Sequence, residues 1–270
     1  MQDFQQKVVV ITGGGGGIGA AMARAFAARG ARLVLADLDE GAMASVASTV
    51  PGAEPLCVRT DVGDLGSVKA LADAAEKRFG GVDVVCNNAG IALFGEMAQA
   101  THADWEFTMR VNFWGVVHGV EVFVPRLLAR GSGHVVNTAS MAGLVGMQWL
   151  GVYCASKFAV VGLTESLHRE LAPHGIGVSV LCPMIVETDI NQNSVRMRPP
   201  ELKNPGPEPI VPSADVAGMV GSVIKPEEVA RRVVRAIERN DLYVLTHPEQ
   251  RKYLKRRSDK LDGMFEPGSW

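Results

Sequence analysis

The sequence has little of what directs a protein to an oxidising compartment, a membrane or nucleic acid. It has four cysteines, with no C-x-x-C pair and no spacing typical of a metal site, so we expect reduced core thiols and no bound metal. The 27 basic and 29 acidic side chains give a formal charge of −2, which argues against a general attraction to nucleic acid or anionic lipid. Glycines and charges interrupt the apolar runs, and the N-terminus lacks a secretion signal. We therefore expect a cytoplasmic protein that binds neither membranes nor nucleic acid.

Glycine, in contrast, is concentrated after the first apolar run, in the segment VVVITGGGGGIG of residues 8–19. A β-branched run followed by helical spacing over Ile18–Arg29 predicts a strand, a turn and a helix, with Gly30 at the helix end. Glycines in such a turn let a pyrophosphate approach the backbone at the helix N-terminus. Composition does not choose between two registers of the turn, Gly14, Gly16 and Gly19 or Thr12, Gly13, Gly17 and Gly19.

The next apolar run, ARLVLAD, ends at Asp37, which is 37 − 19 = 18 residues after Gly19. This is close to the offset of roughly 20 residues at which an acid hydrogen-bonds the ribose hydroxyls of a dinucleotide. A carboxylate there repels the 2′-phosphate of NADP, and neither the glycine loop nor Leu38 and Asp39 add positive charge. The segment therefore predicts a site for NAD rather than NADP.

Short apolar runs alternate along the chain with segments long enough for helices. This alternation predicts a single doubly wound α/β domain, a Rossmann fold over 1–270, with a mostly parallel seven-stranded sheet covered by helices on both faces. The runs are Val8 to Ile11, Arg32 to Ala36, Pro55 to Val58, Val82 to Cys86, His134 to Asn137, Val178 to Leu181 and Leu242 to Leu245. Ligands of such sheets bind beyond the carboxyl ends of the strands, so the site is expected where these runs end.

One segment, about 188–225, departs from the alternation. It contains RPPELKNPGPEPIVPS, which has too much proline for a helix or a central strand, and a long irregular insert of this kind is typical of a functional loop. We expect a substrate lid here. Pro226 and the acids that follow it predict the start of a helix. A C-terminal extension covers about 247–270, and its basic run RKYLKRRSDK favours a solvated helix face.

The residues best suited to chemistry occur in YCASK, where Tyr153 and Lys157 are four residues apart and share one face of a helix. A neighbouring ammonium favours the phenolate of a tyrosine, so such a pair can exchange protons near neutral pH. The spacing is common on exposed helix faces, and the pair alone is weak evidence. Ser140 strengthens it, because it follows a predicted strand at the same sheet edge and can hydrogen-bond an oxygen on which charge develops.

With these residues in place, the chain resembles the classical short-chain dehydrogenase/reductase family over nearly its whole length. The matching pieces occur in the family's order, and they are TGGGGGIG from Thr12, Asp37, DV at Asp61, NNAG at Asn87, Asn112 in VNFWG, Ser140, Tyr153 and Lys157. The resemblance selects the glycine register of Thr12, Gly13, Gly17 and Gly19. It implies an NAD-dependent oxidoreductase that interconverts a secondary alcohol and its ketone.

The resemblance also implies a role for each residue. Tyr153 would exchange a proton with the substrate oxygen, which Ser140 would orient. Lys157 would bind the nicotinamide ribose and, with the charge of the oxidised ring, lower the pKa of Tyr153. Asn112 would hold a water that links Lys157 to solvent; without the other motifs, it would be interpreted as a helix residue satisfied locally. The implied cofactor contacts are Thr12, Gly13, Gly17, Ile18, Gly19, Asp37, Asp61, Val62, Asn88, Ala89, Gly90, Tyr153, Lys157, Pro183, Val186 and Thr188.

One position departs from the family pattern, because Met184 follows Pro183 where the family usually has glycine. Its flexible thioether can project toward the substrate. About half of the apolar residues near the site are expected to be ordinary core residues. We expect a pocket for a bulky apolar or aromatic alcohol or ketone, lined by Phe94, Met141, Met147, Leu150 and Met184.

Four segments, MQDFQQKVVVITGG, GVVHGVEVFVPRLLARG, GIGVSVLCP and LYVLTHPE, are also similar to the bacterial Cα-dehydrogenases that oxidise the benzylic alcohol of lignin-derived aryl ethers. Alternative functions are a 3-oxoacyl thioester reductase, a hydroxysteroid dehydrogenase, or a dinucleotide-sensing protein without catalysis. Asp37 opposes the first, since thioester reductases of the family usually prefer NADPH, and the complete catalytic set opposes the last. The resemblance further implies a homotetramer or a homodimer.

Overall fold

The computed structural model describes residues 1, 3–52, 54–205 and 221–265. Within these residues, seven strands form one sheet in the order β3, β2, β1, β4, β5, β6, β7. All neighbouring strands are parallel, and each predicted strand agrees with an observed one to within two residues at either end, so the predicted fold class is confirmed. The strands are β1 (Val8–Thr12), β2 (Arg32–Asp37), β3 (Leu56–Arg59), β4 (Val84–Asn87), β5 (Gly133–Thr138), β6 (Ile176–Cys182) and β7 (Tyr243–Leu245).

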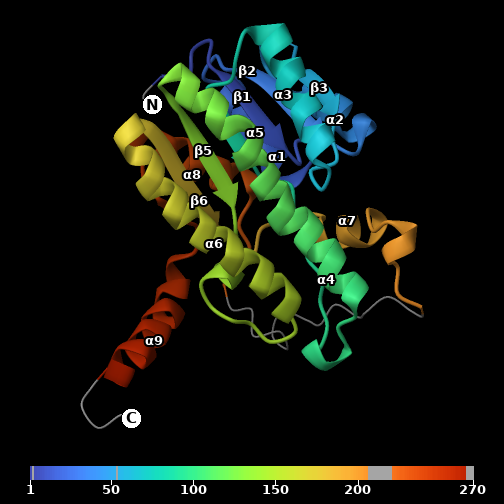
Figure 1. The fold of residues 1–270 in the computed structure, drawn as a ribbon, viewed down its shortest axis with the longest axis vertical. Helices are drawn as coiled ribbons and strands as arrows, with labels where there is room; N and C mark the ends of the chain where they lie inside the picture. Colours follow the sequence, from blue (N-terminus) through green and yellow to red (C-terminus); the bar gives the residue numbers. More distant parts are fainter. Residues whose placement is uncertain (2, 53, 206–220, 266–270) are drawn as a thin grey trace.

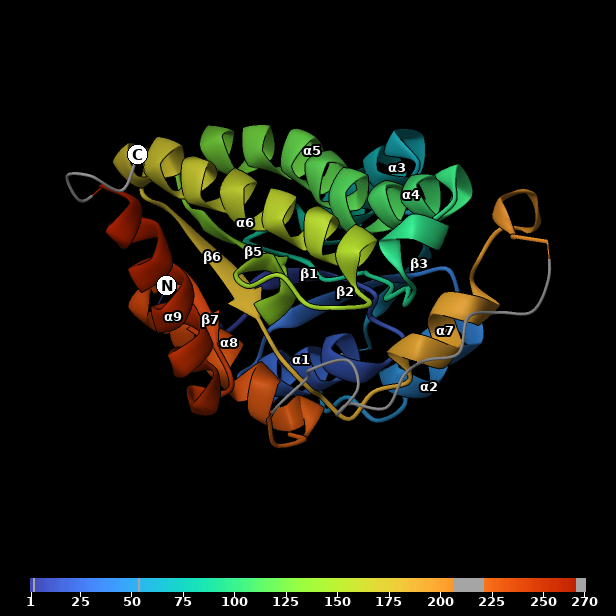
Figure 2. The same cartoon turned by 90° about the horizontal axis from the view of Figure 1, so that it is seen from below.

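Helices cover both faces of the sheet (Figure 2). One layer contains α1 (Gly17–Ala27), α2 (Glu40–Ala47) and α8 (Pro226–Arg239). The other contains α3 (Leu65–Phe79), α4 (His102–Met109), α5 (Gly115–Arg130) and α6 (Gly151–Leu171). A π-helical turn, Arg110–Trp114, joins α4 to α5 into one long rod that runs over the sheet (Figure 1).

The central strand β1 shows why the strands of this sheet are apolar throughout. Val9 and Ile11 pack into a core shared with α1 and α8, whereas Val8 and Val10 pack into a second core shared with α3 and α5. All four side chains are at most 2% exposed. A parallel strand buried on both faces has no solvent-facing side that would accept polar residues.

The predicted helix ends need one correction. The first helix, α1, ends at Ala27, two residues before the predicted end at Arg29, and the chain then turns through Gly30 with a φ of 78°. The predicted start of a helix at Pro226 is confirmed, because α8 begins there with proline in its first turn.

The predicted lid is partly helical, so its interpretation as wholly irregular is wrong for the described part. Helix α7 (Ile190–Arg196) precedes the prolines, and a short 3₁₀ turn follows at Pro200–Leu202. Because a residue before proline is disfavoured in the helical region, Pro199 explains why α7 stops where it does. At its base, Val186 bridges to Ile224, so the two roots of the segment are paired. The remainder of the predicted lid, 206–220, lies outside the described residues.

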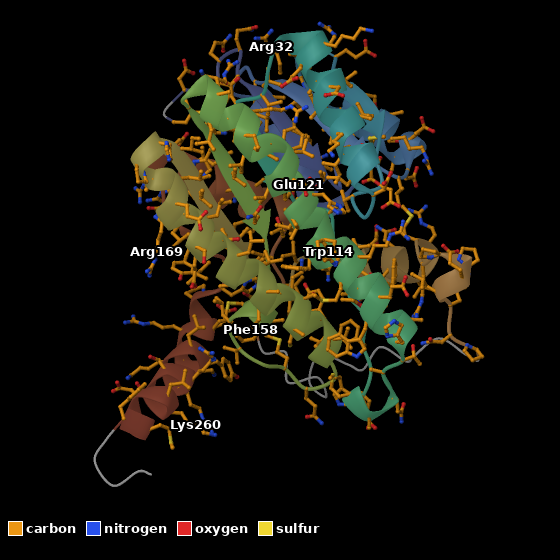
Figure 3. The ribbon with its side chains drawn as sticks, in the orientation of Figure 1. Arg32, Trp114, Glu121, Phe158, Arg169 and Lys260 are labelled. Atoms are coloured by element: carbon orange, nitrogen blue, oxygen red, sulfur yellow. The ribbon has the colours of Figure 1, made fainter. Side chains whose placement is uncertain are left out.

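The C-terminal extension contains helix α9 (Arg251–Asp262), which extends away from the sheet (Figure 1). None of its residues is buried, which confirms the predicted solvated face, and Lys260 marks its far part in Figure 3. Residues 266–270 of the extension lie outside the described part. Within the described chain, no helix is long and apolar enough to cross a membrane.

Candidate active site

A cavity of about 700 Å³ opens at the carboxyl ends of the central strands. Strand β1 lies between β2 and β4, so the chain reverses its direction of travel across the sheet at this point, which is where open α/β sheets bind ligands. One end of the cavity is lined by the glycine loop and Asp37, and the other by Ser140, Tyr153 and Lys157. The structure therefore brings together the two groups of residues that the sequence separates by about a hundred positions.

The glycine loop is shaped to admit a ligand against its backbone. Gly13 and Gly17 have φ values of +66° and +49°, which side chains rarely adopt, and a side chain on Gly19 would collide with the carbonyl oxygen of Gly13. The Cβ position of Gly16, the residue before α1, faces open space. No side chain caps α1, so its first N–H groups are free to bind an anion. These features fit the pyrophosphate of a dinucleotide.

Asp37 is held in place at the far end of the cavity. Its Oδ2 accepts a hydrogen bond from the Gly15 N–H at 2.9 Å, and its Oδ1 accepts one from the Asp39 N–H at 3.2 Å. The sequence placed no cation here, but α7 brings Arg196 to 3.1 Å from Asp39 Oδ2. The hydrogen bond from the Ala42 N–H, together with the Arg196 guanidinium, holds the pKa of Asp39 below its usual value.

Two of the predicted cofactor contacts, Thr12 and Gly19, do not line the cavity, and their contact with the cofactor stays a prediction. Thr12 is buried, and its Oγ1 accepts hydrogen bonds from the N–H groups of Asn88 at 2.9 Å and Ala89 at 3.0 Å. It thereby holds the NNAG loop against β1. The remaining predicted contacts do line the cavity, and they are Gly13, Gly17, Ile18, Asp37, Asp61, Val62, Asn88, Ala89, Gly90, Tyr153, Lys157, Pro183, Val186 and Thr188.

Tyr153 and Lys157 lie one turn apart on α6, and Ser140 lies at the end of β5, as predicted. Lys157 Nζ donates a hydrogen bond of 3.0 Å to the Thr138 carbonyl oxygen. Desolvation lowers the pKa of Lys157 to about 8. Desolvation also raises the pKa of Tyr153 to about 12, although its hydrogen bond with Ser140 opposes the shift. Burial thus outweighs the hydrogen bond, and a phenol with a pKa of about 12 is protonated at neutral pH.

Asn112 lies in the π-helical turn, a feature that the sequence does not reveal. Its side chain hydrogen-bonds both backbone groups of Ile91: Oδ1 accepts from the N–H at 2.9 Å, and Nδ2 donates to the carbonyl oxygen at 3.0 Å. Nδ2 also donates to Ser156 Oγ at 3.1 Å. Asn112 does not line the cavity, but a side chain on Gly90 would lie 3.2 Å from its Oδ1 and 3.4 Å from Lys157 Nζ. Single π-helical turns within α-helices are frequent at functional sites.

The apolar end of the cavity is lined by four of the five predicted residues, Phe94, Met147, Leu150 and Met184. Met141 is the exception, since it is 1% exposed and does not line the cavity. The 3₁₀ turn after Ser140 directs it into the interior, where its N–H donates to the Pro183 carbonyl oxygen at 2.8 Å. Phe107 and Val111, which the sequence did not single out, also line the cavity, because α4 and the π-helical turn come from a distant part of the chain.

His247, which the sequence did not single out, supports the loop after β6. It is 3% exposed, and its Nδ1 accepts from the Met184 N–H at 3.3 Å. Its Nε2 lies 2.9 Å from the Ser222 carbonyl oxygen and 3.2 Å from that of Ile185, so Nε2 carries the proton. One buried imidazole therefore joins both roots of the lid.

Comparison with known proteins agrees with this geometry. Residues 7–199 match the family model described as short chain dehydrogenase. The crystal structure of a short chain dehydrogenase/reductase from Burkholderia phymatum in complex with NAD is 40% identical, with a TM-score of 0.91, and the match covers 99% of this chain and 98% of that one.

Two of the relatives are dehydrogenases by name, and the name of the second contains an alcohol. The C alpha-dehydrogenase of Sphingobium sp. (strain NBRC 103272 / SYK-6) is 32% identical over 99% of this chain and 89% of its own length. The meso-2,3-butanediol dehydrogenase of Serratia marcescens is 36% identical over 84% of this chain and 85% of its own length. From the family match and these relatives, this chain belongs to the short-chain dehydrogenase family and is an oxidoreductase.

Proposed function

We propose that this protein is an NAD-dependent dehydrogenase that interconverts a bulky apolar or aromatic secondary alcohol and its ketone. The observation that carries the proposal is one continuous cavity, with a backbone cradle and Asp37 at one end and Ser140, Tyr153 and Lys157 beside apolar walls at the other. The NAD complex of the relative from Burkholderia phymatum supports it, as do the relatives named as C alpha-dehydrogenase and meso-2,3-butanediol dehydrogenase.

NAD, when bound, supplies the acceptor of the hydride that leaves the alcohol carbon. The loop of residues 13–18 is suited to its pyrophosphate, since the backbone there is open and uncapped. Asp37 is suited to the adenosine ribose, and Asp61 and Val62 are assigned to the adenine. The nicotinamide end is assigned to Lys157 and to the loop after β6, which contributes Val186 and Thr188 to the cavity.

The proton chemistry follows from the chain's own residues. Because the Tyr153 phenol is protonated at neutral pH, it is ready to donate a proton to a carbonyl oxygen that becomes an alkoxide. The Ser140 hydroxyl, which accepts from the Ala142 N–H at 3.1 Å, orients the same oxygen. In the direction of oxidation, Tyr153 accepts the proton, and additional positive charge beside the phenol must then lower its pKa. We assign Asn112 the water that returns the proton through Lys157 to solvent.

The substrate class rests on the cavity walls. Phe94, Met147, Leu150 and Met184 line the cavity together with Tyr153. An apolar wall strengthens the binding of aryl or alkyl groups and disfavours free sugars or small acids.

We also propose the organisation of the whole chain. It forms one catalytic domain with a substrate lid over about 188–225 and an extension over about 247–270, and it assembles as a homotetramer or a homodimer in the cytoplasm. Light scattering coupled to size-exclusion chromatography measures the assembly directly.

The function is tested by NADH formation with purified protein over a panel of aryl and aliphatic secondary alcohols. NADP is supplied in parallel, and the variants are Tyr153→Phe and, as a matched control, Tyr243→Phe, which removes an exposed hydroxyl bonded to Glu165. We expect turnover of bulky alcohols with NAD, loss of at least about a hundredfold in kcat for Tyr153→Phe, and no loss for the control. Equal activity of Tyr153→Phe and wild type would contradict the mechanism.

A further inference from the structure

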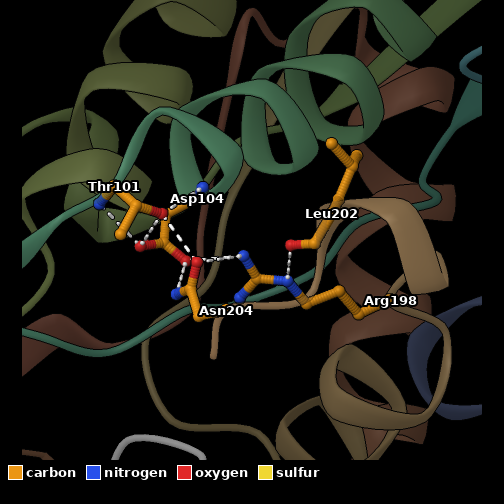
Figure 4. Close-up of polar contacts among 5 residues, drawn as sticks. All are labelled: Thr101, Asp104, Arg198, Leu202 and Asn204. Carbon is orange, nitrogen blue, oxygen red and sulfur yellow. Dashed lines mark hydrogen bonds and ion pairs between the residues drawn. The ribbon is translucent and has the colours of Figure 1, made fainter. Parts of the chain in front are cut away.

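A buried arginine fastens the part of the lid that follows α7 to helix α4. Arg198 is 3% exposed, and its Nη2 lies 2.8 Å from Asp104 Oδ1. Its Nε donates to the Leu202 carbonyl oxygen at 2.6 Å, and Nη2 also reaches Asn204 Oδ1 at 3.4 Å. Figure 4 shows the guanidinium between these acceptors. An arginine this deeply buried is rare unless its charge is paired.

Asp104 can pair with this charge because its two carboxylate oxygens contact different segments, the N-terminus of α4 and the lid. Oδ2 accepts from the N–H of Thr101 at 2.8 Å and from its hydroxyl at 2.9 Å, which completes the capping box of α4. Oδ1 faces the lid, where it pairs with Arg198 and accepts from Asn204 Nδ2 at 2.9 Å. The N-terminus of α4 and the lid therefore share one carboxylate (Figure 4).

This fastening bears directly on the wall of the cavity. Leu202 is 7% exposed and packs in one cluster with Ile91 and Phe107, both of which line the cavity. The Arg198 guanidinium lies 5.8 Å from the centroid of the Phe107 ring. Met197, the neighbour of Arg198 in the chain, lines the cavity itself. Displacement of Arg198 would therefore move both Met197 and the residues that support Phe107.

The burial of the charge makes this closed arrangement depend on Asp104. Without the carboxylate, a buried Arg198 would have no counterion, which is unfavourable. Movement of the segment away from α4 would then lower the free energy, because the guanidinium would reach water. The neighbouring pair of Arg196 and Asp39 differs, because the Arg196 side chain is 58% exposed and exposed pairs contribute little. Of the two arginines, Arg198 is the one able to hold the segment.

We propose that Arg198 is a positioning residue for the alcohol substrate: through Asp104 it holds residues 197–204 on α4 and keeps Met197 and Phe107 in the cavity wall. The proposal rests on the proposed function, since it assigns the apolar end of the cavity to the substrate. It makes the Arg198–Asp104 pair a determinant of affinity for bulky substrates rather than of the chemical step.

The test compares wild type with Arg198→Met, Asp104→Asn, Arg198→Lys and a control, Lys255→Met, which removes an exposed ion pair with Asp259 on α9. Hydrogen exchange of peptides covering 190–204 reports the position of the segment. Steady-state kinetics give KM and kcat for a bulky aryl alcohol and for a small aliphatic one. Calorimetry gives the Kd of NAD, and the Kd of an aryl ketone on the NADH complex.

We expect Arg198→Met and Asp104→Asn to exchange faster over 190–204. Both should raise KM for the aryl alcohol and Kd for the aryl ketone by about tenfold, with kcat and the Kd of NAD within about threefold of wild type. The small alcohol should be affected less, because it does not reach the moved wall. Arg198→Lys keeps the charge but loses the bond from Nε, so it should lie between these variants and wild type, and Lys255→Met should equal wild type.

Two results would overturn the proposal. Unchanged exchange over 190–204 would show that the pair does not hold the segment, and faster exchange with unchanged KM and ketone Kd would show a purely structural pair. If Arg198→Met does not fold, Asp104→Asn and Arg198→Lys decide the question. If wild type oxidises no alcohol in the panel, the proposed function fails separately, and the exchange and ketone binding still decide the role of Arg198.

Discussion

Lys157 Nζ lies 5.7 Å from the centroid of the Tyr153 ring and at the same time donates a 3.0 Å hydrogen bond to the Thr138 carbonyl oxygen. The first contact lies within α6, whereas the second ties this helix to the end of β5. Thr138 Oγ1 in turn donates to Asn88 Oδ1 at 3.3 Å in the loop after β4. The position of the phenol is therefore set by the sheet edge and not by the helix alone.

Replacement of Ser140 by alanine should lower kcat by about a hundredfold and leave the Kd of NAD unchanged. The hydroxyl hydrogen-bonds Tyr153, the proposed proton donor, and Ser140 itself is not among the proposed cofactor contacts. Stopped-flow rates and calorimetry measure the two quantities. Loss of NAD affinity equal to the loss in kcat would contradict the assigned role.

Asp37→Ser should reduce the preference for NAD over NADP by about tenfold or more. It removes a carboxylate that accepts from the ribose hydroxyls and repels a 2′-phosphate, and hydrogen bonds to charged groups contribute about 1.5–3 kcal/mol. The ratio of kcat/KM for the two cofactors checks this. Because Asp37 also accepts from the Gly15 N–H, a thermal melt of the variant separates loss of the loop from loss of recognition. An unchanged ratio would show that Asp37 does not contact the ribose.

The free energy of unfolding should change with pH in the alkaline range because Lys157 has a lower pKa in the folded protein than in the unfolded chain. Its pKa is lowered from 10.5 to about 8 in the folded protein, so the unfolded chain binds more protons between these values. The free energy of unfolding should therefore rise with pH across this window, by up to roughly 3 kcal/mol relative to Lys157→Met. Tyr153, whose pKa is raised from 10.0 to about 12, and Cys86, Cys154 and Cys182, whose pKa values burial raises from 9.0, act in the opposite direction at the alkaline end of this window, and the comparison with Lys157→Met cancels their contributions. Urea titrations of both proteins below pH 8 and near pH 10 measure the difference; parallel pH curves would be inconsistent with it.

His247→Ala should destabilise the fold by about 2 kcal/mol, because it removes a buried imidazole together with its hydrogen bonds to the Met184 N–H and the Ser222 carbonyl oxygen. Hydrogen exchange should increase at 184–186 and at 222–224 together, since one imidazole joins both. His168→Ala is the control, as that histidine is partly exposed and contacts the Val178 carbonyl oxygen at 3.2 Å. Faster exchange at only one of the two roots would disprove the joint role.

The strands, the glycine turn and the pairing of Tyr153 with Lys157 were predictable from the sequence, because each depends on neighbours within a few residues. A β-branched run buried on both faces is apolar at every position, and residues four apart on a helix share a face in any fold. Gly13 and Gly17 were placed in the correct turn for the same reason, since their backbone conformation is a local requirement.

The walls of the site were decided only by the tertiary structure. Arg196 meets Asp39 across 157 positions of the chain, and Arg198 meets Asp104 across nearly a hundred. The inward direction of Met141 and the clamp of Asn112 on Ile91 likewise depend on the 3₁₀ and π-helical turns that packing imposes. Local residue patterns predict which secondary structure a segment forms and which face it buries. They do not predict which distant segment covers that face, because that contact forms only when the helices pack on the sheet.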